Sequence, residues 1–256
     1  MPRNKMEFTS VTNGNKSKHG RGGLRLGYGS EFHLLRWLGR HRDKLTELVC
    51  DKRKEWHSIR WLDFNFSARE KIPDQELQGI EFLNTEDNKD RNYYRVLEAF
   101  SNSQEKSWPS RGEKMNWDLV GVADDGTYIL CEAKAHTEEI KKHKKTPKSA
   151  RKINQAFELP KKMFEVDSNV DWLHTYYQMA NKLYMVALLE SCGIKAVLLN
   201  ILFTGDCFPD GQKVTCPKDQ KGWSTILDDE YGCLGLDKTK KVVRDHVIEL
   251  FLPVCE

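Results

Sequence analysis

The segment 116–136, which reads N-W-D-L-V-G-V-A-D-D-G-T-Y-I-L-C-E-A-K-A-H, constrains the fold more than any other stretch of the chain. Two apolar runs flank the turn residues 124–126, a pattern that predicts a β-hairpin. Gly126 suits the left-handed backbone conformation that closes a three-residue loop with a bulge. In that register Ala123 lies opposite Thr127, and the residue numbers of every opposed pair add up to 250.

The same register places charged side chains together on the hairpin. Asp118 lies opposite Glu132, and Asn116 lies opposite Lys134, with facing Cβ atoms roughly 5 Å apart. Glu132 and Lys134 are two residues apart, so they project from one face of their strand. A two-residue Asp-Gly turn would instead place Asp118 opposite Ala133, on the other face from Glu132. The register therefore decides whether the two carboxylates meet.

Two carboxylates in one small volume repel each other unless a cation lies between them. Hard oxygen ligands in a partly open site suit Mg²⁺, for which Mn²⁺ can substitute, and such an ion keeps waters and accepts a phosphate. Asp118, Glu132 and Lys134 would then form a site for phosphodiester hydrolysis. The alternative is an exposed ion pair at a hairpin edge, worth about 0–1 kcal/mol. The strand Y-I-L-C-E-A-K-A is apolar on both faces, which favours a buried central strand and the metal site.

A helix is predicted over residues 30–49, with Ser30 as its N-cap. Its apolar stripe consists of Leu34, Leu35, Leu38, Leu45, Leu48 and Val49. Glu31 lies on this stripe by spacing, and a carboxylate that faces the core needs a cationic partner. Alternatively, Glu31 complements the helix dipole at a partly exposed end. Glu98, in V-L-E-A-F, is a rival to Glu31 for the role of a helix carboxylate at the site.

The rest of the chain mixes strands with helices and shows no internal repeat. We expect a strand at 59–66, either a helix or a strand at 93–100, helices at 148–166 and 171–192, a buried strand at 196–204, a short helix near 218–230 and a last strand at 246–252. This succession predicts a single α/β domain over 30–256 with a central mixed sheet flanked by helices. Residues 1–29, rich in Asn, Lys, Ser and Gly, predict a flexible basic arm.

The order of an acidic helix, an aspartate on one strand and E-x-K on the next resembles the PD-(D/E)xK, or restriction-endonuclease-like, nuclease superfamily. The resemblance covers roughly 30–40 and 110–204, and it implies a core of a helix, an antiparallel β-meander, a second helix and a further strand, with an insert at about 50–108. It also implies that Asp118, Glu132 and Glu31 are metal ligands and that Lys134 is the catalytic lysine. Trp117 stands where the family pattern has proline. The implied activity is hydrolysis by a metal-activated water.

Several other side chains are candidates for contact with phosphate or for support of the site. A basic segment follows the hairpin and comprises Lys141, Lys142, Lys144, Lys145, Lys148, Arg151 and Lys152. Its position beside Lys134 favours contact with flanking phosphates, although lysine runs are commonly solvated surface. Arg111 precedes the first hairpin strand and is a further candidate for phosphate contact. Gln178 shares a helical stripe with Asn181 and Lys182, and it resembles a residue that faces the site in some members of the superfamily, or else it belongs to a solvent-facing stripe.

The sequence thus predicts a DNA endonuclease that depends on Mg²⁺. The alternatives are a catalytically inactive nucleic-acid-binding protein of the same fold and a nuclease that acts on RNA. The net charge of +3 permits an anionic partner, and symmetric cutting of a duplex would suit a homodimer. We expect no association with a membrane, because the longest apolar run, A-V-L-L-N-I-L-F, is too short to span one. The N-terminal residues lack a signal core and the seven cysteines form no C-x-x-C pair, so we expect a cytoplasmic protein with free thiols.

Overall fold

A mixed sheet of five strands forms the centre of the structure, a computed structural model that describes residues 28–62, 77–83, 91–102, 115–140, 150–207 and 214–254. The strand order is β1 (Ile59–Trp61), β4 (Leu119–Ala123), β5 (Tyr128–Lys134), β6 (Ala196–Thr204) and β7 (Val247–Pro253). The first three strands are antiparallel neighbours, whereas β6 is parallel to β5 and β7 is parallel to β6. The predicted α/β class with a mixed sheet is therefore confirmed.

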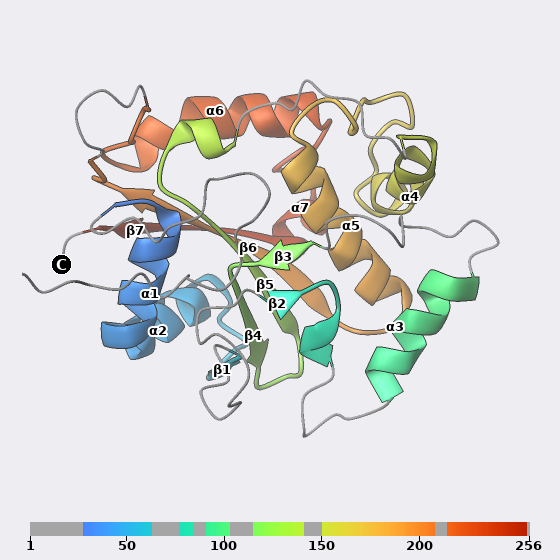
Figure 1. Cartoon of the computed structure of the whole chain (residues 1–256), viewed down its shortest axis with the longest axis horizontal. Helices are drawn as coiled ribbons and strands as arrows, with labels where there is room; N and C mark the ends of the chain where they lie inside the picture. Colours follow the sequence, from blue (N-terminus) through green and yellow to red (C-terminus); the bar gives the residue numbers. More distant parts are fainter. Residues whose placement is uncertain are drawn as a thin grey trace, which may run out of the picture.

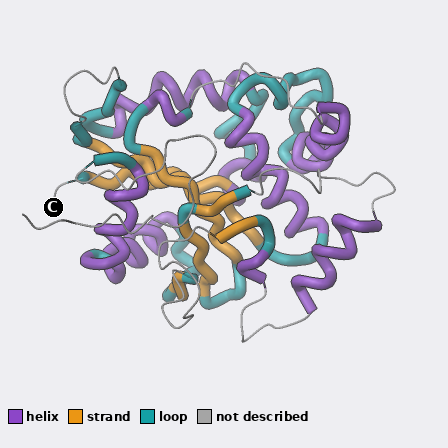
Figure 2. Tube along the Cα trace, in the orientation of Figure 1, coloured by secondary structure: helices purple, strands orange, loops and turns teal. Residues whose placement is uncertain are grey.

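Helices cover both faces of this sheet, which runs between them through the middle of the molecule (Figures 1 and 2). On one face pack α1 (Ser30–Arg40) and α2 (Arg42–Lys52), which bury Leu34, Trp37 and Leu45 against alternate strand residues such as Ile129. On the other face pack α4 (Ala150–Met163), α5 (Tyr177–Ser191) and α6 (Gln220–Cys233). A sheet covered on both faces needs apolar residues on both sides of its central strands.

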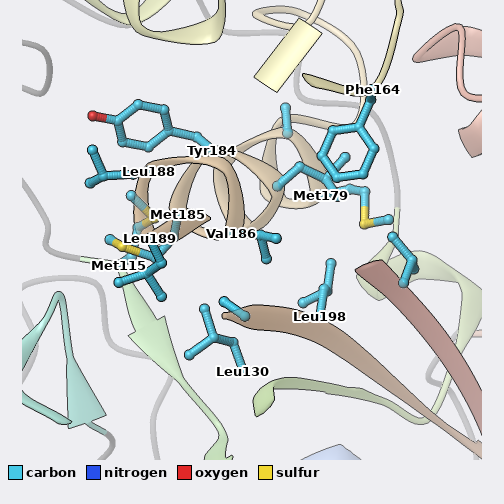
Figure 3. Packing of buried hydrophobic residues seen from close by; sticks show 14 of the residues in the cluster. Met115, Leu130, Phe164, Met179, Tyr184, Met185, Val186, Leu188, Leu189 and Leu198 are labelled. Carbon is cyan, nitrogen blue, oxygen red and sulfur yellow. The ribbon is translucent and has the colours of Figure 1, made fainter. Parts of the chain in front are cut away.

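The helix α5 lies directly over the central strands. Its side chains Met179 and Val186 point towards Leu130 of β5 and Leu198 of β6 (Figure 3). The buried residues of α5 form a nearly continuous run from Met179 to Leu189. Because the helix is enclosed on most sides, it needs apolar residues around most of its circumference. This placement brings the polar side chains in the first turns of α5 over the C-terminal part of β5.

The remaining described elements lie around this core. They are α3 (Arg91–Asn102), α7 (Lys241–His246), the two short helical turns η1 (Glu81–Leu83) and η3 (Thr137–Glu139), and a two-stranded ladder of β2 (Leu77–Gln78) with β3 (Asn116–Trp117). The segment 93–100, for which the sequence left helix and strand open, is helical. The strand β1 lies within the segment expected as an insert, and it pairs with β4 at the edge of the sheet.

The helices expected at 148–166 and near 218–230 correspond to α4 and α6 within three residues at each end, whereas two other predicted helices differ more from the structure. The helix expected over 30–49 is interrupted at His41, whose backbone leaves the helical region two residues after Gly39, a poor helix former. The helix expected from 171 begins only at Tyr177. The Asp171 carboxylate accepts hydrogen bonds from the backbone N–H groups of Leu173 and His174, which stabilise a turn there instead of a helix.

The expected arm at 1–29 falls almost entirely outside the described residues. Within them, six cysteines are free, as expected, and no helix is long and apolar enough to cross a membrane.

Gly121 in β4 provides a test of the pairing between β4 and β1. A Cβ atom at this position would lie 2.9 Å from Ile59 Cγ2 and from two ring carbons of Trp61, closer than packed atoms tolerate. We expect Gly121→Ala to lower the free energy of unfolding by about 1–3 kcal/mol in urea titrations. The control is Gly232→Ala in α6, where the added Cβ meets no atom within 4 Å and should leave stability equal or higher. Equal effects of the two substitutions would contradict this packing.

Candidate functional site

The hairpin has the register that its turn sequence predicts. Gly126 adopts a φ of 83°, and its backbone N–H donates to the Ala123 carbonyl (2.9 Å). The N–H of Ala123 donates to the carbonyl of Thr127 (2.9 Å), and Leu119 pairs with Cys131. Continued by one residue, this ladder places Asp118 beside Glu132. The three-residue loop is therefore confirmed, and the alternative two-residue turn is wrong.

Asp118 lies just before β4 and is bound to the neighbouring strand through its side chain. Its Oδ2 accepts a hydrogen bond from the backbone N–H of Ala133 (2.6 Å). Burial, with the added repulsion from Glu132, raises the pKa of the Asp118 carboxyl above its usual value. The two carboxylates thus interact as expected, and their repulsion disfavours the charged form of Asp118.

Two lysines hold the carboxylate of Glu132. Lys134 Nζ lies 2.5 Å from Oε1, and Lys182 Nζ, from α5, lies 2.7 Å from Oε2. Burial acts to raise the pKa of Glu132, but the two ammonium groups outweigh it and bring the pKa below its usual value. Burial likewise opposes the charge on Lys134, but Glu132 and Asp118 raise the pKa of its ammonium group. In this arrangement Lys134 holds its proton and supplies positive charge.

Lys182 is a member of the site that the sequence reasoning did not single out. Its Nζ donates to the carbonyl of Asn116 and lies 4.4 Å from the centre of the Trp117 ring. The signal was present, because Lys182 follows Gln178 by four residues and shares its helical stripe. Periodicity did not indicate that this stripe faces β5. Which side of a helix contacts a given strand depends on how segments distant in the sequence pack together.

A small cavity of about 30 Å³ lies between β5, β6, α5 and α6, next to these charges. Its polar lining comprises Glu132, Lys134, Gln178, Lys182, Asn200 and Glu230. A polar cavity of this size has room for a water molecule or a small ion. Gln178 lines this cavity and is also exposed to solvent, so its role as a support of the site stays a prediction beside the alternative of a solvent-facing stripe.

A row of polar residues crosses the sheet at the level of Glu132. The parallel ladders align Glu132 of β5 with Asn200 of β6, and Asn200 with Glu249 of β7. Glu230 of α6 is only 6% exposed and lines the same cavity. Its burial raises its pKa to about 8. Asn200 interrupts an apolar strand sequence, which is a detectable signal, whereas nothing local marks Glu230 as buried.

Glu31 does not join this cluster in the way that the helix pattern suggested. It is exposed in the first turn of α1, and α1 packs on the sheet face opposite to the one that carries Glu132 and Lys134. The expectation that Glu31 faces the core is wrong, because its side chain is exposed although Leu34 and Leu38 of the same stripe are buried. Its position fits the alternative, a carboxylate at the positive end of a helix dipole.

The rival carboxylate, Glu98, is also exposed, on α3. This helix is fixed at the far end of α5, where Arg95 Nη1 donates to the carbonyl of Cys192 (2.9 Å). About ten residues of α5, or ~15 Å of helix, separate that point from Lys182. The structure therefore brings Asp118, Glu132, Lys134 and Gln178 together, but neither Glu31 nor Glu98.

Most of the predicted phosphate-binding residues lie outside the described part of the chain. These are Arg111, Lys141, Lys142, Lys144, Lys145 and Lys148. Arg151 and Lys152 are exposed on α4. The expectation that this segment contacts phosphate stays a prediction.

The side chains of Asp118 and Glu132 fit a metal ion that takes only a few of its ligands from the protein. Among the described residues, no group of three or more His, Cys, Asp or Glu side chains is arranged to hold a metal. Asp118 and Glu132 remain as a pair of carboxylates, and Mg²⁺ is commonly held by one or two carboxylates while its other ligands are waters and substrate phosphates. The donor set therefore fits Mg²⁺ better than Zn²⁺, which prefers four protein ligands in structural sites.

Comparison with known protein families, with characterised proteins and with solved structures gives no match, so the functional argument rests on this geometry.

The ion pair between Lys182 and Glu132 should contribute to stability. Removal of one partner of a buried pair leaves the other charge with less compensation, so we expect Lys182→Met to lower the free energy of unfolding by about 3 kcal/mol. Addition of Glu132→Gln to that variant should recover part of the loss. Lys195→Met, which breaks an exposed pair with Asp125, should change stability by less than about 1 kcal/mol. Equal losses for both lysines in denaturant titrations would show that the central pair has no special role.

The raised pKa of Glu230 predicts a pH-dependent stability. Its folded pKa of about 8 exceeds that of an unfolded glutamate, so the native state favours the protonated form. This contribution is complete below about pH 4 and is lost as the pH rises towards about 8, at ~1.4 kcal/mol per pH unit. The advantage of Glu230→Gln over the wild type should therefore grow between pH 5 and pH 8 in thermal melts with EDTA. Glu47→Gln, at an exposed position of α2, is the control. A pH-independent difference between Glu230→Gln and wild type would be inconsistent with a buried neutral carboxyl.

Proposed function

We propose that this protein is a Mg²⁺-dependent nuclease that hydrolyses phosphodiester bonds of DNA. The observation that carries the proposal is the hairpin register, which sets Asp118 beside Glu132 with Lys134 bound to Glu132. Repulsion between two largely buried carboxylates costs free energy, which a structural ion pair alone does not require. A divalent cation and a phosphate diester together would offset that cost.

The arrangement of the elements supports the same proposal. The resemblance to PD-(D/E)xK nucleases implies a helix, an antiparallel meander, a second helix and a further strand. The chain has α1, then the antiparallel strands β1, β4 and β5, then α5, then β6. Asp118 directly precedes β4, and the E-A-K residues lie on the neighbouring strand β5, an order that agrees with the resemblance.

Each residue of the site has a role in this proposal. Asp118 and Glu132 would hold Mg²⁺, which would act as a Lewis acid towards the phosphate and activate a water. Lys134 and Lys182 would stabilise negative charge that develops on the phosphate, since both are cationic and already directed at Glu132. Gln178 would orient the substrate through its amide.

A second candidate is a nucleic-acid-binding protein without catalytic activity. It is favoured by the contacts of Glu132, because Lys134 and Lys182 already compensate the charge of its carboxylate. The site geometry also suits RNA as a substrate, because the described residues include no contact that distinguishes the two sugars.

The test is a cleavage assay on supercoiled plasmid, single-stranded DNA and single-stranded RNA in Mg²⁺, Mn²⁺ or EDTA. We expect metal-dependent nicking of the plasmid, which would identify an endonuclease, and a loss of at least 100-fold in rate for Asp118→Asn and Lys134→Ala. Lys195→Ala, at the exposed far end of the hairpin, should retain the wild-type rate.

Two outcomes would contradict the proposal. Cleavage that survives Asp118→Asn and Lys134→Ala would place the activity elsewhere or in a contaminant. A wild-type protein that cleaves no substrate and binds no Mn²⁺ in calorimetric titration would favour the non-catalytic candidate. Glu31→Gln and Glu98→Gln, assayed in parallel, would show whether either helix carboxylate contributes in spite of its exposure.

A further inference from the structure

A second and larger pocket lies at the outer edge of β7, apart from the hairpin. It has a volume of about 290 Å³ and is formed by the end of α2, by α6 and α7, by the segment between these two helices, and by β7 itself. Four cationic side chains line it, Lys52, Arg53, Lys238 and Arg244, against a single carboxylate, that of Glu249. The pocket therefore carries an excess of positive charge.

The carboxylates near this pocket are engaged by other cations. Glu249 lies 3.3 Å from Lys238, which also meets Asp228 at 3.4 Å. Asp245 lies near enough to Arg53 to feel its charge, but its carboxylate is bound by Lys241. In the part of the chain that the structure describes, no ion pair joins Lys52, Arg53 or Arg244 to a carboxylate.

The side chain of Arg53 is bound to the backbone of α7. Arg53 Nη2 donates to the carbonyl of Arg244 (2.7 Å), so the guanidinium of Arg53 is fixed at the origin of the Arg244 side chain. The four cationic side chains that line the pocket repel one another, and a bound anion would reduce this repulsion. A phosphate fits this position well, because guanidinium groups donate two parallel hydrogen bonds to its oxygens.

The pocket lining also includes apolar side chains. Val243, Phe251 and the ring of Tyr231 contribute to it, and Lys238 Nζ lies 4.2 Å from the centre of that ring. The volume is near the lower limit of small-molecule sites. It would accommodate a phosphate together with part of an attached nucleoside.

We propose that the pocket at the edge of β7 binds a phosphate group carried by a nucleotide or by a nucleic-acid strand. The pocket is separate from the hairpin site. Glu249 is aligned with Glu132 through Asn200, so two strand spacings, or about 10 Å, separate the two backbones. The proposal does not require that the protein cleaves nucleic acid, and it holds for the non-catalytic candidate as well.

The test is calorimetric titration at low salt in EDTA, which removes metal from the hairpin site. The probes are inorganic phosphate, adenosine monophosphate, and a ten-residue oligothymidylate with and without a 5′-phosphate. The variant is Lys52→Gln with Arg244→Gln, two side chains that make no hydrogen bond within the described structure. The matched control is Lys54→Gln with Lys221→Gln, which removes equal charge from exposed positions next to Arg53 and Gln220 but outside the pocket lining.

We expect at least one probe to bind the wild type and the control with similar affinity, and to bind the pocket variant at least tenfold more weakly. Binding of adenosine monophosphate or inorganic phosphate would identify a free phosphate ligand as the source. Binding of the oligonucleotide alone would identify a strand, and dependence on its 5′-phosphate would identify the strand end. Absence of saturable binding to the wild type, or equal loss in the variant and the control, would overturn the proposal whether or not the protein proves to be a nuclease.

Discussion

The contact of Glu132 with Lys134 and Lys182 is the interaction on which the arrangement of the central elements depends. Glu132 lies on β5, and Lys182 reaches it from α5, about fifty residues further along the chain. Lys182 also binds the carbonyl of Asn116 and lies over the Trp117 ring, so one ammonium group joins α5 to β5 and to the entry of β4. A buried charge costs free energy unless it is paired. The ion pair between Glu132 and Lys182 therefore favours the one position of α5 on the sheet in which the two side chains meet.

This pairing also defines what the site can do. The cluster has two carboxylates and two lysines, and the pKa of Asp118 is raised because it is buried next to Glu132. Under the proposed nuclease function, Asp118 and Glu132 would hold a divalent cation, which would offset the repulsion between their carboxylates. In the same proposal Lys134 and Lys182 would supply positive charge to the phosphate.

Positive charge is distributed unevenly over the described surface. The net charge of the chain is only +3, yet the β7 pocket gathers four cationic side chains around one carboxylate. The polar row through Glu132, Asn200 and Glu249 runs across the sheet from the hairpin site towards that pocket. Bulk composition does not reveal this cluster of positive charge, because it forms where the end of α2 meets Lys238 and Arg244, almost two hundred residues further along the chain.

The sequence by itself determined the local features: the hairpin register, the strands β5, β6 and β7, the helical character of most other segments, and the facing of Asp118 and Glu132. Each follows from turn chemistry or from a period along one element. Only the tertiary structure decided which faces meet. It placed Lys182, Asn200 and Glu230 at the site, left Glu31 exposed on the opposite side, and built the β7 pocket from separate elements. The physical reason is that periodicity identifies the buried face of a helix or strand, whereas its partner across the core is set by the packing of residues distant in the chain.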